Sequence, residues 1–275
     1  MAVYTEVSDA ELEGFLSGYS LGRPLSFKGV AEGVENSNYV LETETGRYIL
    51  TLYERRVKAA DLPYFLGLME HLAEAGFPSA RPVADHAGRT LGELAGRPAA
   101  IVAFLSGLSV KRPGVGHCRE AGEGLAWLHQ AGAGFAPRRE NDLGQGAWVA
   151  MFETLAPRAE ALKPGLAAQI GGDVAAIAAA WPRGLPQGVV HADWFPDNVF
   201  FRDGRFVGAI DFYFAANDQL AYDLGVALNA WCFEPDGSFN VTAGRALVEG
   251  YERRRKLTAA EKAALPALAR GAALR

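Results

Sequence analysis

The sequence has little cysteine, no long hydrophobic run and no excess of basic residues. Its two cysteines, Cys118 and Cys232, are far apart and show no paired spacing. This argues against a disulfide framework or a zinc site and favours a reducing compartment. The longest apolar runs, AAIVAFL and VAAIAAAW, fall far short of the roughly 20 residues that span a bilayer. The net charge of −5 argues against a long nucleic-acid surface, which needs clustered Lys and Arg.

The remaining composition is that of an ordinary globular protein, with 49% hydrophobic and 21% charged residues. A chain of 275 residues is long enough for one large domain or two smaller ones. The first residues, MAVYTEVSDAELEGF, are acidic and lack an apolar core, which is not the pattern of a signal or transit peptide. We therefore expect a cytoplasmic protein without a membrane or nucleic-acid partner.

Hydrophobic spacing predicts an α+β chain with two lobes. In the N-lobe, residues 1–105, we expect a small antiparallel sheet with one long helix against it. In the C-lobe, residues 106–275, helices dominate. The N-lobe elements are a capped helix at 8–19, strands at 24–31, 38–43 and 47–54, a helix at 61–76, and strands at 80–90 and 97–105. In the C-lobe we expect helices at 119–132, twice between 150 and 181, and from 220 onward, with a hairpin at 198–210.

Polar side chains gather in the stretch HADWFPDNVFF and just after the predicted hairpin. Asp193 and Asn198 lie five residues apart in one loop, and Asp211 follows the second hairpin strand. Carboxylate and amide oxygens that meet at one point suit Mg²⁺, and a further carboxylate can accept a proton from an attacking hydroxyl. The order H-x-D-x-x-x-x-N, a strand and then D-F is the order of base and two metal ligands in protein kinases.

Other interpretations of these residues stay open. His191 can be a structural anchor of the loop through backbone hydrogen bonds, and Asp223 can be an acid at a helix start. Asp193, Asn198 and Asp211 can form a hydrogen-bonded loop that binds no ligand. At the level of function, the alternatives are a non-catalytic nucleotide-binding module and a metal-dependent phosphoester hydrolase that uses His191.

The segments GVVHADWFPDNVFF and GAIDFYFAANDQLAYDLGVALNAWCF resemble the homoserine kinase branch of the aminoglycoside/choline-kinase-like superfamily. Further segments match that branch in the same order: GVENSNYVLET, RYILTLYERRV, DLPYFLGLMEHLAEAGFP, GRPAAIVAFLSG and GLAWLHQAG. The resemblance covers nearly the whole chain. It implies a two-lobed protein-kinase-like fold with ATP between the lobes. It also implies phosphate transfer to the hydroxyl of L-homoserine, a step of threonine biosynthesis.

By position, the resemblance also implies roles for individual residues. Asp193 would be the catalytic base, and Asn198 and Asp211 would be the Mg²⁺ ligands. ATP would contact a phosphate loop, AEGVENSN, a helix acid that follows it and a hinge, VAFL. The residues concerned are Gly33, Asn36, Asn38, Glu70, Ala103 and Leu105.

Two features depart from the protein-kinase pattern. Thr51 stands about where a kinase places the strand lysine that holds the α- and β-phosphates. Arg55 or Arg56 can supply the missing charge, or the two can be a solvated pair at a strand end. The phosphate loop has Gly29 and Gly33 followed by asparagines, in place of G-x-G-x-x-G.

The substrate of this resemblance carries an ammonium and a carboxylate. Asp218 and Asn217 are close enough in sequence to the site to serve the first, and Arg139 or Asn141 could bind the second. The alternative substrate is an aminoglycoside or a choline-like amino alcohol, the latter held by cation–π contacts. The candidate aromatic residues for that alternative are Tyr213, Phe214, Tyr222 and Trp231.

Overall fold

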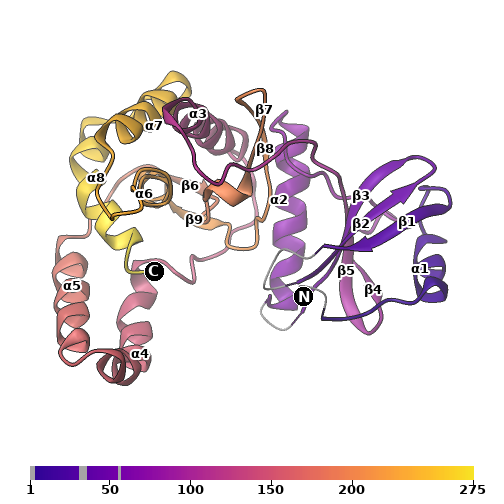
Figure 1. Cartoon of the computed structure of the whole chain (residues 1–275), viewed down its shortest axis with the longest axis horizontal. Helices are drawn as coiled ribbons and strands as arrows, with labels where there is room; N and C mark the ends of the chain where they lie inside the picture. Colours follow the sequence, from indigo (N-terminus) through magenta and orange to yellow (C-terminus); the bar gives the residue numbers. More distant parts are fainter. Residues whose placement is uncertain (1–3, 31–35, 55–56) are drawn as a thin grey trace. The chain divides into compact units, whose positions relative to one another are not determined.

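The computed structural model describes residues 4–30, 36–54 and 57–275, and the chain forms two compact units. The first unit is Met1–Ser106 and the second is Gly107–Arg275 (Figure 1). The predicted α+β class is confirmed: most strands lie in the first unit and most helices lie in the second. No helix among the described residues is both long and apolar enough to cross a membrane.

The first unit is built on a five-stranded antiparallel sheet with the strand order β1-β2-β3-β5-β4. The strands are β1 (Pro24–Gly29), β2 (Ser37–Thr43), β3 (Gly46–Leu52), β4 (Gly92–Leu94) and β5 (Arg97–Ala103). Strands β2 and β3 form the predicted hairpin, with Thr43 opposite Gly46 across the turn. Strand β5 pairs with β3 from Tyr48 to Leu52, which makes β3 a central strand.

The two faces of this sheet have different chemistry because side chains alternate along each strand. One face carries Tyr39, Leu41 and Leu50, which form a core with Leu12 and Leu16 of α1 (Asp9–Leu16). The predicted capping box is present at the start of this helix, where Ser8 and Glu11 bond each other's backbone amides. The alternate positions carry Asn38 and Thr51, a hydrogen-bonded pair. The long helix α2 (Leu62–Glu74) follows a short 3-10 turn, Ala59–Asp61.

The strand predicted at 80–90 is wrong. In that segment the structure has one isolated bridge, between Pro82 and Val102, and the fourth strand is β4. The carboxylate of Asp85 accepts hydrogen bonds from the amides of Ala87 and Arg89, both at 2.9 Å. These local bonds close a turn, and they compete with strand pairing for the same amides.

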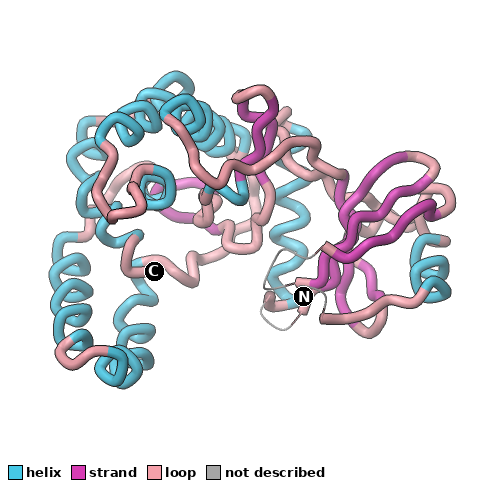
Figure 2. Tube along the Cα trace, viewed as in Figure 1, coloured by secondary structure: helices cyan, strands magenta, loops and turns pink. Residues whose placement is uncertain are grey.

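The second unit is mainly helical (Figure 2). Its helices are α3 (Val115–Ala131), α4 (Trp148–Leu162), α5 (Leu166–Ala180), α6 (Leu220–Trp231), α7 (Val241–Arg254) and α8 (Ala259–Ala272), with a 3-10 turn at Gln145–Ala147. Ten of the twelve residues of α6 are buried, so this helix forms the centre of the unit. Ala221, Tyr222 and Val226 of α6 pack in one core with Trp148 and Leu268.

Two small two-stranded sheets border the polar loop of the second unit. Strands β7 (Val199–Arg202) and β8 (Arg205–Ala209) form the hairpin that the sequence predicts. Strands β6 (Gln187–Val190) and β9 (Ala216–Gln219) form a second antiparallel pair that the sequence analysis did not predict. The polar loop therefore leaves β6 and enters β7 after a 3-10 turn, Pro196–Asn198.

Helices α3 and α7 cross with their backbones in contact. A Cβ atom added at Gly122 of α3 would collide with the carbonyl oxygen of Leu247, and one added at Gly250 of α7 would collide with that of Arg119. Only glycine fits at these two positions, because the obstacle is backbone and cannot rotate away.

Candidate active site

The carboxylate of Asp223 holds the start of the polar loop. It lies in the first turn of α6, is fully buried, and accepts hydrogen bonds from the amides of His191 at 2.7 Å and Ala192 at 2.9 Å. His129 of α3 contacts the same carboxylate through Nε2 at 3.1 Å. Burial alone would raise the pKa of Asp223, but the bond and charge of His129, with His191, outweigh it, and the pKa lies below its usual value. Asp223 is therefore a charged anchor for the loop.

His191 joins the loop to the hairpin behind it. Its Nδ1 receives a hydrogen bond from the amide of Asp193 at 3.2 Å, and its Nε2 lies 3.0 Å from the carbonyl oxygen of Ile210. Because an amide only donates, Nδ1 is the acceptor, and the pattern of bonds assigns the hydrogen to Nε2. Burial lowers the pKa of His191, which agrees with a neutral ring. The structural interpretation of His191 is thus the one that its contacts support.

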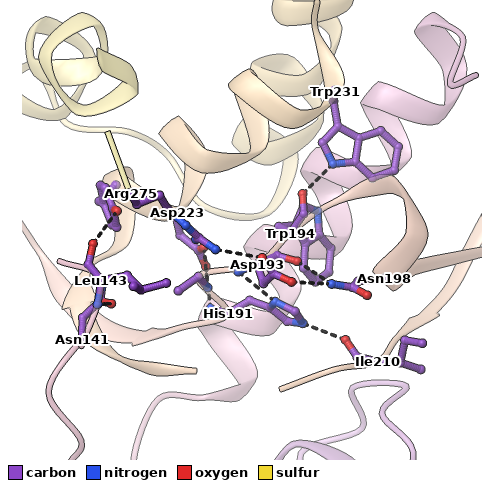
Figure 3. A network of polar contacts seen from close by, with 12 residues as sticks. Asn141, Leu143, His191, Asp193, Trp194, Asn198, Ile210, Asp223, Trp231 and Arg275 are labelled. Atoms are coloured by element: carbon purple, nitrogen blue, oxygen red, sulfur yellow. Dashed lines mark hydrogen bonds and ion pairs between the residues drawn. The ribbon is translucent and has the colours of Figure 1, made fainter. Parts of the chain in front are cut away.

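Asp193 and Asn198 lie together, as Figure 3 shows. The side-chain nitrogen of Asn198 donates to Oδ2 and to the main-chain oxygen of Asp193, both at 2.9 Å. These two bonds fix the orientation of the amide, and its oxygen points away from Asp193 (Figure 3). Asp193 keeps about a fifth of its side chain exposed, at 19%. It is therefore ordered and still within reach of a substrate.

Asp211 follows Ile210, whose backbone is bonded to Asn198. The amide of Ile210 donates to the carbonyl oxygen of Asn198 at 3.0 Å, and Ile210 is also the residue that His191 bonds. Asp211 follows directly, with a left-handed backbone at φ 61°. Such conformations are found at active sites and also in tight turns, such as that of Asp203 in this chain.

The oxygens of Asn198 and Asp211 suit a magnesium ion. Mg²⁺ prefers carboxylate and carbonyl oxygens, and it is commonly bound by one or two protein groups together with waters and phosphate oxygens. The nitrogen of Asn198 is committed to Asp193, so the oxygen is the atom that it can present. No cluster of three His, Cys, Asp or Glu side chains suited to a metal occurs in the described part of the chain.

One residue near Asp193 was missed by the sequence analysis. Nη2 of Arg275, beyond the end of α8, lies 2.8 Å from Oδ1 of Asp193, and its side chain is only 11% exposed. The guanidinium carbon lies 5.9 Å from the ring centre of Phe195 and 5.8 Å from that of Phe214. Since 82 residues separate the pair in sequence, no local pattern could have predicted it.

The substrate candidates contact one another in pairs within the second unit. Asp218 accepts hydrogen bonds from the side chain of Asn141 at 2.8 Å and from the amide of Gln219 at 2.7 Å, and burial raises its pKa. Asn217 and Arg139 bond to each other, the amide of Arg139 donating to the side-chain oxygen of Asn217 at 2.9 Å.

The guanidinium of Arg139 has partners of its own. It pairs with Asp142 and donates to the carbonyl oxygens of Glu140 and Ala215. Arg139 therefore already supports the local backbone through several contacts.

Two of the four aromatic residues considered for a cation–π site belong to the core. Tyr222 and Trp231 are buried, and the indole nitrogen of Trp231 donates to the carbonyl oxygen of Trp194 at 2.7 Å. Phe214 faces a cation, but that cation is Arg275 of the same chain. These contacts weigh against a choline-type aromatic box.

The asparagines predicted for the phosphate loop are tied into the sheet of the first unit. The side-chain oxygen of Asn38 accepts a hydrogen bond from Thr51 at 2.8 Å, and that of Asn36 accepts one from the amide of Glu54 at 3.3 Å. The side-chain nitrogens are therefore the groups that they can offer to a phosphate. Gly33, Arg55 and Arg56 lie outside the described residues.

Glu70 and the predicted hinge are linked by Arg81. Nη2 of Arg81 lies 3.8 Å from a carboxylate oxygen of Glu70, and Glu74 lies 3.6 Å from the same nitrogen. The carbonyl oxygen of Arg81 accepts a hydrogen bond from the amide of Ala103 at 2.8 Å. The amide of Ala103 is therefore already bonded within the first unit.

Residues 26–257 match the model of the phosphotransferase enzyme family. The chain is 64% identical to a homoserine kinase of Caulobacter vibrioides (strain NA1000 / CB15N), over 100% of this chain and 87% of that protein. It is 66% identical to a homoserine kinase of Phenylobacterium zucineum (strain HLK1), over 100% of this chain and 85% of that protein.

Solved structures of kinases have a similar fold. One is an amicoumacin kinase in complex with AMP-PNP, Ca²⁺ and Ami, with a TM-score of 0.70, 16% identity, and coverage of 95% of this chain and 82% of that one. Another is a microcompartment-associated aminopropanol kinase, with a TM-score of 0.62, 19% identity, and coverage of 95% and 85%. These matches confirm the predicted kinase-like fold.

Proposed function

This chain belongs to the phosphotransferase enzyme family, and on that premise we propose that it transfers the γ-phosphate of ATP to the hydroxyl of L-homoserine. The observation that carries the proposal is the identity of 64% and 66% with two homoserine kinases over the full chain. The contacts around Asp193, Asn198 and Ile210 support it, because they bring together the residues that would act as base and as oxygen ligands.

Asp193 is the proposed base of the reaction. The hydroxyl oxygen of homoserine attacks the γ-phosphorus in line with the leaving group, and a new P–O bond forms. The bond between this phosphorus and the β–γ bridging oxygen breaks, and ADP leaves with the electron pair. The hydroxyl proton passes to Asp193 late in the step, since phosphoryl transfer needs positioning more than deprotonation. The hydrogen bond from Asn198 would keep the carboxylate in one orientation during this step.

Asn198 and Asp211 would hold Mg²⁺ through their side-chain oxygens. When bound, the ion offsets the negative charge of the β- and γ-phosphates in the transition state. His191 and Asp223 contribute indirectly, because they fix the loop and the hairpin that carry these ligands.

The first unit supplies the proposed nucleotide contacts. Asn36 and Asn38 would donate to phosphate oxygens, together with the backbone at Gly33. Ala103 and Leu105 would contact the adenine. Glu70 would order the side chain of Arg81, with which it pairs. Thr51 is neutral and bonded to Asn38, so it adds no charge to phosphate binding. We place the reaction in the cytosol, which suits the two free thiols.

The test is ATP turnover with purified protein and Mg²⁺, comparing L-homoserine, choline and kanamycin as acceptors. We expect ADP formation with L-homoserine at a kcat/KM at least on the order of 10⁴ M⁻¹s⁻¹, in the range usual for enzymes, and little with the other two. Phosphorylated homoserine should appear in equal amount. Turnover with choline or kanamycin in place of homoserine would overturn the substrate. ATP binding without any turnover would instead indicate a non-catalytic module.

A further inference from the structure

L-homoserine, the proposed substrate, has three polar groups, and only its hydroxyl has a proposed partner, Asp193. The hydroxyl of L-homoserine meets Asp193, while its α-carboxylate and α-ammonium need partners of opposite charge. A chain of only three carbon atoms joins the hydroxyl to the carboxylate. The cation that binds the carboxylate must therefore lie next to Asp193.

Arg275 meets this requirement in position. Its guanidinium contacts Asp193 through Nη2 at 2.8 Å, and the rings of Phe195 and Phe214 flank it. Arg139, the cation considered from the sequence, is engaged with Asp142 and two carbonyl oxygens. Of these two arginines, Arg275 is the one that touches the proposed base.

Arg275 also keeps a donor for a further acceptor. Nη1 is buried and has no hydrogen-bond partner among the described residues. A buried donor of a charged group that stays unsatisfied is costly. A carboxylate at this nitrogen would remove the cost, and the planar fork of arginine suits two-point binding of a carboxylate.

We propose that Arg275 binds the α-carboxylate of L-homoserine beside Asp193 and selects amino acids over simple amino alcohols. The inference rests on the proposed function. One edge of the guanidinium pairs with Asp193, and the other receives the substrate. The carboxylate thereby fixes the distance from Arg275 to the hydroxyl, so that the hydroxyl reaches Asp193.

Asp218 completes the site as the partner of the ammonium. Tyr222 lies near both charges. Burial is the main cause of its raised pKa, Arg275 lowers this pKa, and Asp218 raises it. Asn141 orients the Asp218 carboxylate at 2.8 Å. The cation and the acid therefore both lie within electrostatic range of one tyrosine.

The test compares two alcohols that differ only in the carboxylate, L-homoserine and 3-aminopropan-1-ol. We expect the wild-type protein to prefer L-homoserine. In Arg275→Gln, kcat/KM for L-homoserine should fall on the order of 10²-fold further than kcat/KM for 3-aminopropan-1-ol, because only the first substrate loses a charged hydrogen bond. Arg275→Lys should lose less, since it keeps the charge but not the fork.

A binding measurement separates recognition from chemistry. Calorimetric affinity for L-homoserine should fall in Arg275→Gln, while affinity for ATP should stay within about twofold. Arg270→Gln is the matched control: Arg270 lies on α8 and pairs with Asp173 at an exposed position, and we expect this variant to bind L-homoserine like the wild type. The melting temperature of each variant checks its folding.

Two results would overturn the inference in different ways. If Arg275→Gln lowers kcat/KM for both alcohols equally, Arg275 only positions Asp193, and the proposed function stands without it. If the wild-type protein neither binds nor phosphorylates L-homoserine, the proposed function and the inference fall together.

Discussion

The carboxylate of Asp193 is held from two sides, by the amide of Asn198 and by the guanidinium of Arg275. Such a group is oriented before the substrate arrives, which lowers the cost of reaching the reactive geometry. In both contacts the partner donates the hydrogen bond and the carboxylate accepts it. Asp193 thus combines order with the ability to accept a proton.

Replacing Asp193 by Asn tests this role at a single atom. Asn has nearly the same shape but does not accept the hydroxyl proton, and we expect kcat to fall on the order of 10²–10⁴-fold. ATP affinity should stay close to that of the wild type, because the proposed nucleotide contacts of the first unit do not involve Asp193. Steady-state kinetics and nucleotide calorimetry measure the two quantities. Turnover at the wild-type rate would show that Asp193 is not the catalytic base.

His191 makes stability depend on pH. Burial lowers the pKa of His191, against the attraction of Asp223 and Asp193 and the bond to Ile210, and Arg275 lowers it further. Below about pH 6.5, His191 therefore binds a proton in the unfolded chain but not in the folded protein. The contribution of His191 to the free energy of unfolding is fully present above about pH 6.5 and is lost as the pH falls toward the folded pKa. The loss is up to about 1.4 kcal/mol per pH unit.

Urea unfolding at several pH values between 5 and 8 measures this slope. All five tryptophans lie in the second unit, so their fluorescence follows the unit that contains His191. His191→Gln should flatten the slope between pH 5 and 6.5. His86→Gln, at an exposed position of the first unit, is the control. An unchanged slope in His191→Gln would contradict the assignment. The lowered pKa of Asp223 acts only below about pH 4 and does not interfere.

At the scale of elements, the crossing of α3 and α7 depends on two glycines. Gly122→Ala places a methyl group against the backbone of α7, which cannot move without separating the helices. We expect a loss of about 1–3 kcal/mol in the free energy of unfolding, as for other overpacked sites. The measurement is tryptophan fluorescence in urea. Gly116→Ala, in the same helix with open space around it, should be neutral or slightly stabilising.

Several elements could be predicted from the sequence because local chemistry decides them. The capping residues Ser8 and Glu11 determine where α1 begins, and the turn between the β7 and β8 strands follows from Asp203 and Gly204, both with positive φ. Strand β9 could not be predicted, since Ala-Asn-Asp-Gln has low strand propensity and pairs only because β6 lies beside it. The false strand at 80–90 had strand-like residues, but Asp85 closes a turn there.

The candidate site, too, could be predicted from the sequence only in part. Asp193, Asn198 and Asp211 stand in a recognisable order, and their assigned roles stay predictions that mutation can test. Arg275 and the anchoring contacts of Asp223 could not be predicted, because they join residues 82 and about 31 positions apart. Packing of α6 and α8 determines such contacts, and no spacing rule records them.

At the scale of the whole molecule, the fold is shared much more widely than the proposed substrate. The chain has a TM-score of 0.70 with an amicoumacin kinase and 0.62 with an aminopropanol kinase, at 16% and 19% identity. A fold does not determine which hydroxyl is phosphorylated, and function depends on the residues around the site. In this chain we propose that these residues are Asp193, Asp218 and Arg275, one for each polar group of the proposed substrate.

The loop from His191 to Asn198 is bonded at both ends and in its middle. Its amides reach Asp223, its histidine reaches Ile210, and Trp194 donates to the carbonyl oxygen of Ala121. Loops usually tolerate changes in length because few contacts depend on their register. Here one added or deleted residue would break several contacts at once. Among descendants of this chain, insertions and deletions should therefore be absent from this stretch while substitutions continue around it.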